Sequence, residues 1–209
     1  QIIDLDNSGR YKYISDDDAA KIETNLSATV LSQKENEIEV PASWFGVLNS
    51  LFIIIFAPVF SKIWGSRLNP SAPVKFAIGL TLLGFGFGLL AIGSMSIEPG
   101  AKTAEVSMIW LILAYLFHTL GELSVSPVGL SYVSKLSPPK LVGLMFGVWY
   151  GAIALANYIA GWTGSYVEKI SDAVGLSGFF LMYTVIPGLA AIALLLMNKW
   201  LKKKMHGIS

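Results

Sequence analysis

The sequence predicts an all-α integral membrane protein: a bundle of five transmembrane helices preceded by a short N-terminal segment outside the membrane. Three observations predict this class. Apolar residues make up 54% of the chain, charged residues only 14%, and mean hydropathy is +0.60, whereas a soluble domain of this length carries more charge. Five apolar stretches are long enough to cross a bilayer as helices. Residues 1–40 hold nine of the fourteen acidic residues, so the head and the body of the chain differ in composition.

Residues 1–42 form the acidic N-terminal segment, for which we predict a hairpin followed by a short helix. Residues 1–5 and 11–15 alternate apolar and polar side chains and flank an Asn-Ser-Gly turn, a pattern typical of a hairpin. Ser15 is followed by three aspartates, which favours a helix N-cap with acidic residues in the first turn.

The same segment imitates the start of a calcium-binding loop. Asp4, Asp6 and Ser8 have the spacing of the first ligands, but the twelfth position is Ser15, where a bidentate glutamate belongs. A solvated hairpin explains the same residues, and we favour that interpretation.

Five apolar stretches define the membrane part of the chain, residues 43–205. They cover residues 44–64, 73–97, 106–134, 141–166 and 176–200. Each reaches the length of about 20 residues that a helix needs to span the hydrocarbon core. Charged residues inside them are few, and the fourth stretch has none.

The charges between these stretches indicate how the chain crosses the membrane. Nine basic residues, with no acidic residue near them, flank the first and third connections and the C-terminus: Lys62, Arg67, Lys75, Lys135, Lys140, Lys199, Lys202, Lys203 and Lys204. The other side carries acids as well as bases. Under the positive-inside rule, residues 201–209 form a basic cytoplasmic tail and residues 1–42 lie on the exterior. We therefore expect a multi-pass protein of the cell (inner) membrane.

Small residues predict where helices pack closely. Gly143, Gly147 and Gly151 recur every fourth residue in the fourth stretch, and Gly84 and Gly88 do so in the second. Such rows let helix backbones approach where lipid gives helices no hydrophobic reason to associate. We interpret them as packing faces.

The third stretch carries the chemistry of the membrane part. Glu122 is the only acidic residue at membrane depth, where a centred charge costs roughly 2.5–3.5 kcal/mol, so it should face the bundle interior or an aqueous cavity. At 100° per residue, His118, Ser126, Gly129 and Tyr115 fall on the same stripe. This stripe indicates a binding or proton-relay surface; the alternative is a His–Glu pair that satisfies itself inside a packed bundle.

Two further residues are candidates with both interpretations open. Asn49 lies one turn inside the first stretch, where it either bonds to another helix or contacts a ligand. Trp149 lies in the middle of the fourth stretch, away from the interface where tryptophans usually collect, and either lines a pocket or packs.

Several classes of site are not expected. The chain has no cysteine, which excludes disulfides and thiolate metal sites, and no HExxH or comparable cluster. We predict no enzyme, no catalytic residues, no bound metal or cofactor, and no nucleic-acid partner. The predicted partner of the body is the lipid bilayer.

At this point the residues match a known family. The runs 121–131 (GELSVSPVGLS) and 135–149 (KLSPPKLVGLMFGVW) resemble the proton-dependent oligopeptide transporter (POT/PTR) family. Residues 48–58 resemble the family's eighth helix, and residues 156–161 continue its eleventh. The resemblance covers about residues 40–205.

The resemblance implies a function and a set of site residues. It implies a major-facilitator fold of two six-helix halves, with this chain holding helices 8–12 of the C-terminal half. Members import di- and tripeptides by proton symport, with protons as the coupling ion. Glu122 matches a glutamate, and Asn49 an asparagine, that hold the peptide's amino end. Ser126 and Trp149 match positions lining the central pocket, and His118 has no match that assigns it a role.

The resemblance also implies that this chain does not act alone. The family's helix-1 motif, its N-terminal basic residues and its helix 7 have no counterpart here, so we expect a fragment whose partners include the N-terminal helices of the same protein. Two alternatives remain: a carrier of another small solute on the same fold, and a non-transporting membrane scaffold. An intramembrane enzyme using His118 and Glu122 as acid and base would need a nucleophile or metal set that the sequence does not show.

Overall fold

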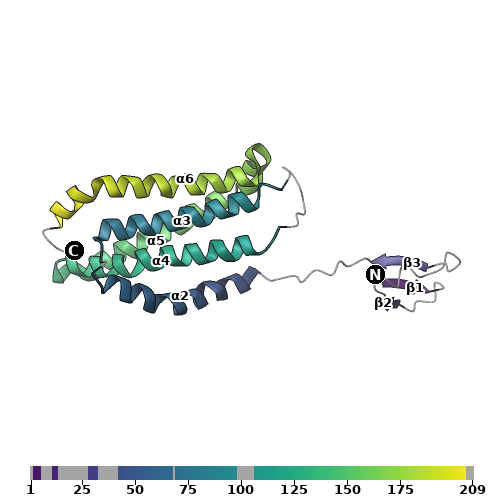
Figure 1. Ribbon diagram of the computed structural model, residues 1–209, viewed down its shortest axis with the longest axis horizontal. Coiled ribbons are helices and arrows are strands. Elements are labelled where there is room, and N and C mark those ends of the chain that lie inside the picture. The colour runs from purple at the N-terminus through teal and green to yellow at the C-terminus, as the bar shows by residue number, and fades with distance from the viewer. Residues whose placement is uncertain are drawn as a thin grey trace. The chain divides into compact units, whose positions relative to one another are not determined.

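A computed structural model of the chain describes residues 2–5, 11–13, 28–32, 42–67, 69–97 and 106–205. The chain divides into two compact units, Gln1–Pro41 and Ala42–Ser209. The two units are described separately, and Figure 1 shows the elements of each.

The N-terminal unit contains a small antiparallel sheet. Strand β1 (Ile2–Leu5) pairs with β2 (Tyr11–Tyr13) on one side and with β3 (Ala28–Ser32) on the other. The β1–β2 pair, in which Ile3 lies opposite Lys12, falls on the residues expected to form a hairpin. Strand β3 was not expected, so the all-α class applies to the membrane unit only. The helix expected after Ser15 and most of the calcium-like loop lie outside the described residues.

The membrane unit contains the five expected spans. Each of its long helices has the length and composition to cross a bilayer, which confirms the predicted class. The helices are α2 (Ala42–Trp64), α3 (Ala72–Gly93), α4 (Ile109–Leu136), α5 (Val142–Gly164) and α6 (Val167–Lys204), with a 3-10 turn η1 (Pro139–Leu141) before α5.

Helix α6 is longer than predicted because it contains two helical pieces. Gly175 has φ 76° and ψ 159°, a conformation open to glycine because it lacks a Cβ atom. The piece before Gly175 carries Glu168 and Asp172 and is too polar to be recognised as a span. The apolar piece begins directly after Gly175, where the fifth span was expected.

Helix α3 is the centre of the bundle, with α4 on one side and α6 on the other (Figure 1). Small residues make these contacts possible. A Cβ at Gly79 would lie 2.8 Å from the Gly121 carbonyl oxygen of α4, and one at Gly84 would lie 3.0 Å from the Thr184 carbonyl oxygen of α6. The packing row expected at Gly84 and Gly88 therefore faces α6.

Helix α2 packs against the other side of α4, whereas α5 makes its main contacts with α4 and η1 and a single side-chain hydrogen bond with α6 among the described elements. No residue of α5 is buried. Its row Gly143, Gly147 and Gly151 has nothing within 4 Å in the described part of the chain. The predicted packing face on α5 is thus present but not occupied by any described segment.

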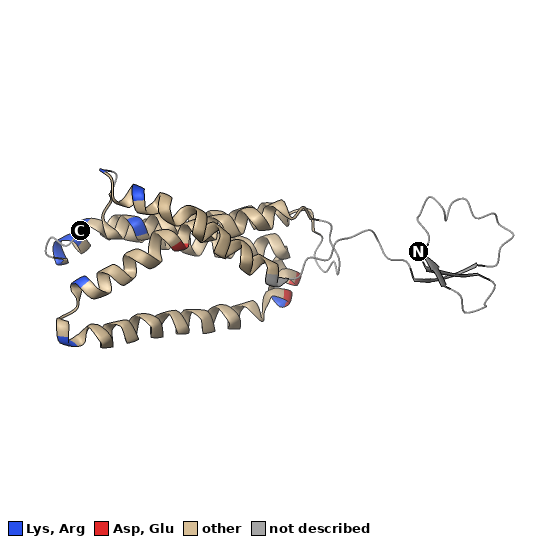
Figure 2. Cartoon of the chain, turned by 90° about the horizontal axis from the view of Figure 1, so that it is seen from below, with Lys and Arg blue, Asp and Glu red and all other residues tan. Residues whose placement is uncertain are grey.

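Charge is distributed along the bundle as the sequence predicted. Figure 2 shows most lysines and arginines of the membrane unit at the end where the C-terminus lies. Lys62 is in the last turn of α2, Lys135 in the last turn of α4, and three lysines end α6. Glu168 lies in the first turn of α6, at the opposite end.

Candidate functional site

Helix α4 carries an acidic side chain, Glu122, at a depth in the membrane where a charge is energetically unfavourable. Glu122 lies in the middle of this membrane-length helix and is exposed. Among the described residues it has no hydrogen-bond or ion-pair partner. A carboxylate in that position is retained only where it meets water, a ligand or another polar group. Glu122 is therefore the centre of the candidate site.

Asn49 is held next to this position by a contact between helices. The Thr119 hydroxyl donates a hydrogen bond of 2.5 Å to the Asn49 side-chain oxygen, and Thr119 is fully buried. One turn away, the Phe45 and Tyr115 rings stack with centroids 5.6 Å apart. These contacts fix α2 against α4 so that Asn49 reaches α4 one turn before Glu122.

Trp149 reaches the same helix two turns after Glu122. Its ring occupies the space above Gly129, where a Cβ would lie 2.1 Å from a ring carbon. Trp149 also lines a cavity of about 440 Å³ together with Phe76 and Tyr132. Because only glycine leaves room for the indole, Gly129 sets the position of Trp149.

The four predicted residues thus meet along one strip of α4: Glu122 and Ser126 belong to this helix, and Asn49 and Trp149 reach it from α2 and α5. At 100° per residue, Thr119, Glu122, Ser126 and Gly129 fall within about 80° of arc. Asn49 joins the strip at Thr119 and Trp149 joins it at Gly129, with half-buried Ser126 between. The structure therefore aligns Asn49, Glu122, Ser126 and Trp149, although no hydrogen bond joins Glu122 to Asn49 or Trp149.

His118 does not share this strip, which corrects the predicted stripe. Its ring lies against α3, with Nε2 2.8 Å from where a Cβ of Gly86 would be and its centroid 4.5 Å from that of Phe87. The Nε2 atom of the ring is buried with no partner in the described part of the chain. The described structure therefore has no His118–Glu122 pair, because the space beside Gly86 accepts the imidazole.

Sequence reasoning missed Thr119, the residue that positions Asn49. Threonine is unremarkable in an apolar helix because its hydroxyl commonly bonds to a carbonyl of the preceding turn. Here the single hydroxyl proton is shared between the Asn49 oxygen and the Tyr115 carbonyl oxygen, which lies 2.7 Å away. The available signal was its place three residues before Glu122, on the same side of the helix.

Comparison with known proteins identifies the family. The sequence model of the POT family (PTR2) matches residues 23–180. The chain belongs to the POT family. Its bundle has the major-facilitator type of fold found in solved POT transporters, and the protein is a multi-pass membrane protein.

Curated relatives support the assignment. A di-/tripeptide transporter of Lactococcus lactis subsp. cremoris is 32% identical over 81% of this chain and 33% of its own length. Peptide transporter YePEPT of Yersinia enterocolitica is 37% identical over 62% of this chain and 26% of its length. The uncharacterized transporter YclF of Bacillus subtilis is 37% identical over 81% of this chain and 33% of its length.

Solved structures show the same relation. A POT peptide transporter in complex with sulfate matches with a TM-score of 0.64 and 30% identity, over 78% of this chain and 32% of that one. A POT family transporter in complex with a thioalcohol-conjugated peptide matches with a TM-score of 0.62 and 30% identity, over 73% and 30%. This chain therefore spans about one third of the length of the POT proteins it matches.

Proposed function

We propose that the protein to which this chain contributes imports di- and tripeptides by proton symport. In this proposal the chain is part of the C-terminal half, with residues 1–42 on the exterior and the C-terminus in the cytoplasm. Its curated relatives are named as di-/tripeptide transporters, and one solved relative holds a conjugated peptide. The observation that carries the proposal is Glu122: an exposed, unpaired carboxylate, within the described residues, on a membrane-spanning helix.

The chemistry of a peptide's amino end suits this strip of α4. A free ammonium carries three donors and a positive charge, so it needs an anion and neutral acceptors. Glu122 supplies the anion in a charge-assisted hydrogen bond, and Asn49 supplies an amide one turn away. Ser126 adds a hydroxyl on the same side of the helix.

The other end of the strip suits a variable side chain. The cavity beside Trp149 is lined almost entirely by apolar groups, including Phe76, Val133 and Met145. Apolar walls accept side chains of many shapes because they make no directional demand. In the proposal, Glu122 sets the register of the peptide and Trp149 tolerates its side chains.

Proton coupling follows from the same carboxylate. Protonation of Glu122 removes its charge and weakens its hold on an ammonium, which provides a step for release into the cell. A proton moving down a membrane potential supplies about 2.3 kcal/mol per 100 mV. Transfer of a proton to Glu122 would link that energy to peptide release.

Uptake of a labelled dipeptide, driven by a pH gradient into liposomes containing the full-length protein, tests this function. We expect Glu122→Gln to weaken peptide affinity roughly 10- to 100-fold, the value of a charge-assisted hydrogen bond. Glu168→Gln, an exposed acid at the start of α6, is the matched control and should leave uptake unchanged.

An N-acetylated dipeptide sharpens the test because it lacks the ammonium. Wild type should prefer the free dipeptide, and Glu122→Gln should lose that preference. If wild type takes up peptide, and Glu122→Gln and Glu168→Gln show the same affinity for the free dipeptide, the role of Glu122 is refuted. If wild type takes up no peptide at all, the substrate class is wrong, and a scaffold or another solute becomes the better explanation.

A further inference from the structure

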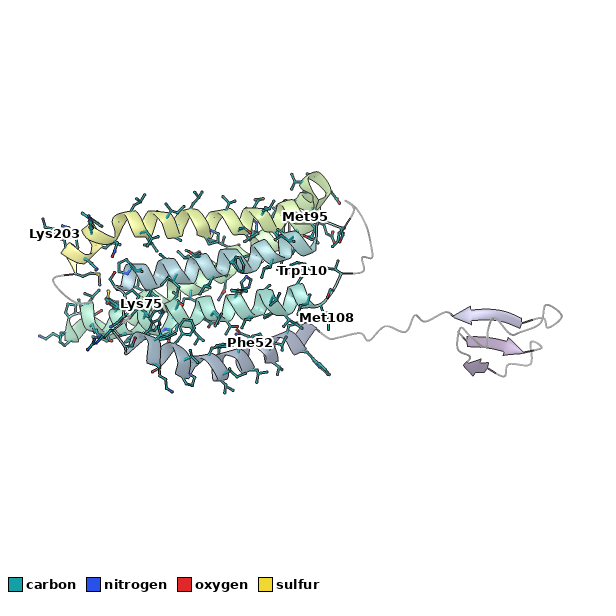
Figure 3. All side chains as sticks on the ribbon, in the orientation of Figure 1. Phe52, Lys75, Met95, Met108, Trp110 and Lys203 are labelled. Atoms are coloured by element: carbon teal, nitrogen blue, oxygen red, sulfur yellow. The ribbon has the colours of Figure 1, made fainter. Side chains whose placement is uncertain are left out.

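Two lysines at the basic end of the bundle lie close together with no anion described beside them. Lys75, in the first turn of α3, is only 9% exposed, and its ammonium lies 5.2 Å from the centroid of the Trp64 ring at the end of α2. The Lys135 ammonium of α4 lies 5.9 Å from the centroid of the Tyr132 ring. The positive charge of Lys135 acts unfavourably on the charged form of Lys75. Figure 3 shows Lys75 toward the end of the bundle that also carries Lys203.

The described acids of the membrane unit lie too far away to balance this charge. Glu168 and Asp172 belong to the start of α6, at the opposite end of the bundle. Glu122 precedes Lys135 on α4 by thirteen residues, a rise of about 20 Å. Burying most of one lysine beside a second like charge is unfavourable unless an anion compensates for it.

An unused hydrogen-bond donor lies in the same cluster. The Trp64 indole nitrogen is buried and has no acceptor among the described residues. Burial without a partner costs a polar group about 1–3 kcal/mol, so such groups usually have an acceptor in the native environment. The cluster therefore combines two cations and one free donor, the complement of an oxyanion.

The backbone adds to the same preference. The cluster surrounds the N-terminus of α3, which begins at Ala72 and is the positive end of the helix dipole. Tyr132 of α4 and Phe76 of α3 line the same cavity, which places Tyr132 beside this end of α3. Helices α2, α3 and α4 thus meet around a site whose charges all favour an anion.

The depth of the cluster selects the kind of anion. Lys75 lies one turn inside the apolar span of α3, and Trp64 and Tyr132 are the amphipathic aromatics that collect where headgroups meet acyl chains. Phospholipid phosphates lie at that level, and basic pockets between helices bind anionic headgroups there. We propose that Lys75, Lys135 and Trp64 bind the phosphate of an anionic phospholipid.

Native mass spectrometry of the full-length protein, titrated with phosphatidylglycerol or with zwitterionic phosphatidylcholine, tests the proposal. We expect Lys75→Gln and Lys135→Gln each to weaken phosphatidylglycerol binding about fivefold, the contribution of one lysine near an anionic surface. Lys75→Arg should retain binding because it keeps the charge. Lys199→Gln is the matched control because Lys199 is an exposed lysine of α6 at the same end of the bundle.

Three results would overturn the proposal. Equal phosphatidylglycerol binding by Lys75→Gln, Lys135→Gln and the Lys199→Gln control would show that the lysines only extend their ammonium groups to the interface. Displacement of the lipid by inorganic phosphate at similar concentration would show a free-phosphate site. Loss of folding in lipid-free detergent on Lys75→Gln, with lipid binding unchanged in Lys135→Gln, would show that a carboxylate elsewhere in the protein is the anion.

Discussion

Helices α3 and α5 are both rich in small residues, but only α3 packs its small residues against other helices. Gly79 and Gly86 of α3 lie against α4, and Gly84 and Gly88 lie against α6. At every glycine between residues 143 and 164 on α5, an added Cβ would have no atom of another element within 4 Å in the described part of the chain. The same sequence signal therefore corresponds to a complete interface on α3 and to an open face on α5.

This difference indicates what else the bundle requires. A large apolar cavity of about 820 Å³ lies between α5 and the α3–α6 pair, with residues such as Leu80, Ala156 and Ile186 in its walls. One hydrogen bond, from the Tyr183 hydroxyl to the Thr163 hydroxyl oxygen at 2.6 Å, crosses from α6 to α5. The relatives are about two and a half times as long as this chain, and we expect further helices of the protein to cover α5.

The largest effect should come from closing the space at the α3–α4 contact. Gly79→Ala places a Cβ 2.4 Å from a methyl carbon of Val125 and 2.8 Å from a backbone oxygen, so the helices must separate. We expect a loss of about 1–3 kcal/mol in stability, measured as thermal unfolding in detergent. Gly46→Ala in α2, which meets nothing within 4 Å, is the control and should be neutral or stabilising. Equal effects of the two would mean that α3 and α4 pack less tightly than described.

A smaller effect, whose sign is informative, is expected on α5. Leucine is a better helix former than glycine by about 0.8 kcal/mol, so Gly147→Leu on a truly open face should stabilise the protein slightly. If other helices cover the row, overpacking outweighs that gain and the full-length protein loses about 1–2 kcal/mol. We expect the loss. If Gly147→Leu stabilises the full-length protein, the glycine row of α5 is not covered by another helix. The glycines of α3 would then be packing residues, and those of α5 would not.

The sequence predicted the positions of the helices far better than it predicted which elements pack against one another. Hydropathy locates a span because a bilayer demands a run of about 20 apolar residues whatever the helix packs against. The exception is the piece of α6 before Gly175, which is helical but polar. Strand β3 was missed for a different reason, since its pairing with β1 depends on residues distant in the sequence.

Periodicity placed the candidate site only in part. It placed Glu122, Ser126 and Gly129 on one side of α4 because angular position on a helix follows from residue number. It could not tell that His118, 40° from Glu122, turns toward Gly86 of α3, because that depends on which neighbouring helix leaves a space. The contact of Trp149 with Gly129 was likewise invisible, since it joins two helices.

The smallest expected effect concerns the contact that holds Asn49. The α2–α4 interface contains the Thr119–Asn49 side-chain hydrogen bond, and such a bond in membrane proteins contributes about 0.6 kcal/mol on average. Thr119→Val removes the hydroxyl while keeping its shape, so stability should fall by about that amount, and Thr119→Ser should restore it.

Peptide affinity separates positioning from simple packing. If Thr119 orients Asn49, Thr119→Val raises the KM for a free dipeptide more than the KM for its N-acetylated form. Thr119→Ser then returns both KM values to those of wild type. If Thr119 only fills space, the two peptides respond alike and the serine variant, which lacks a methyl group, is no better than valine. The second result would leave Asn49 a packing residue and limit the candidate site to α4 and Trp149.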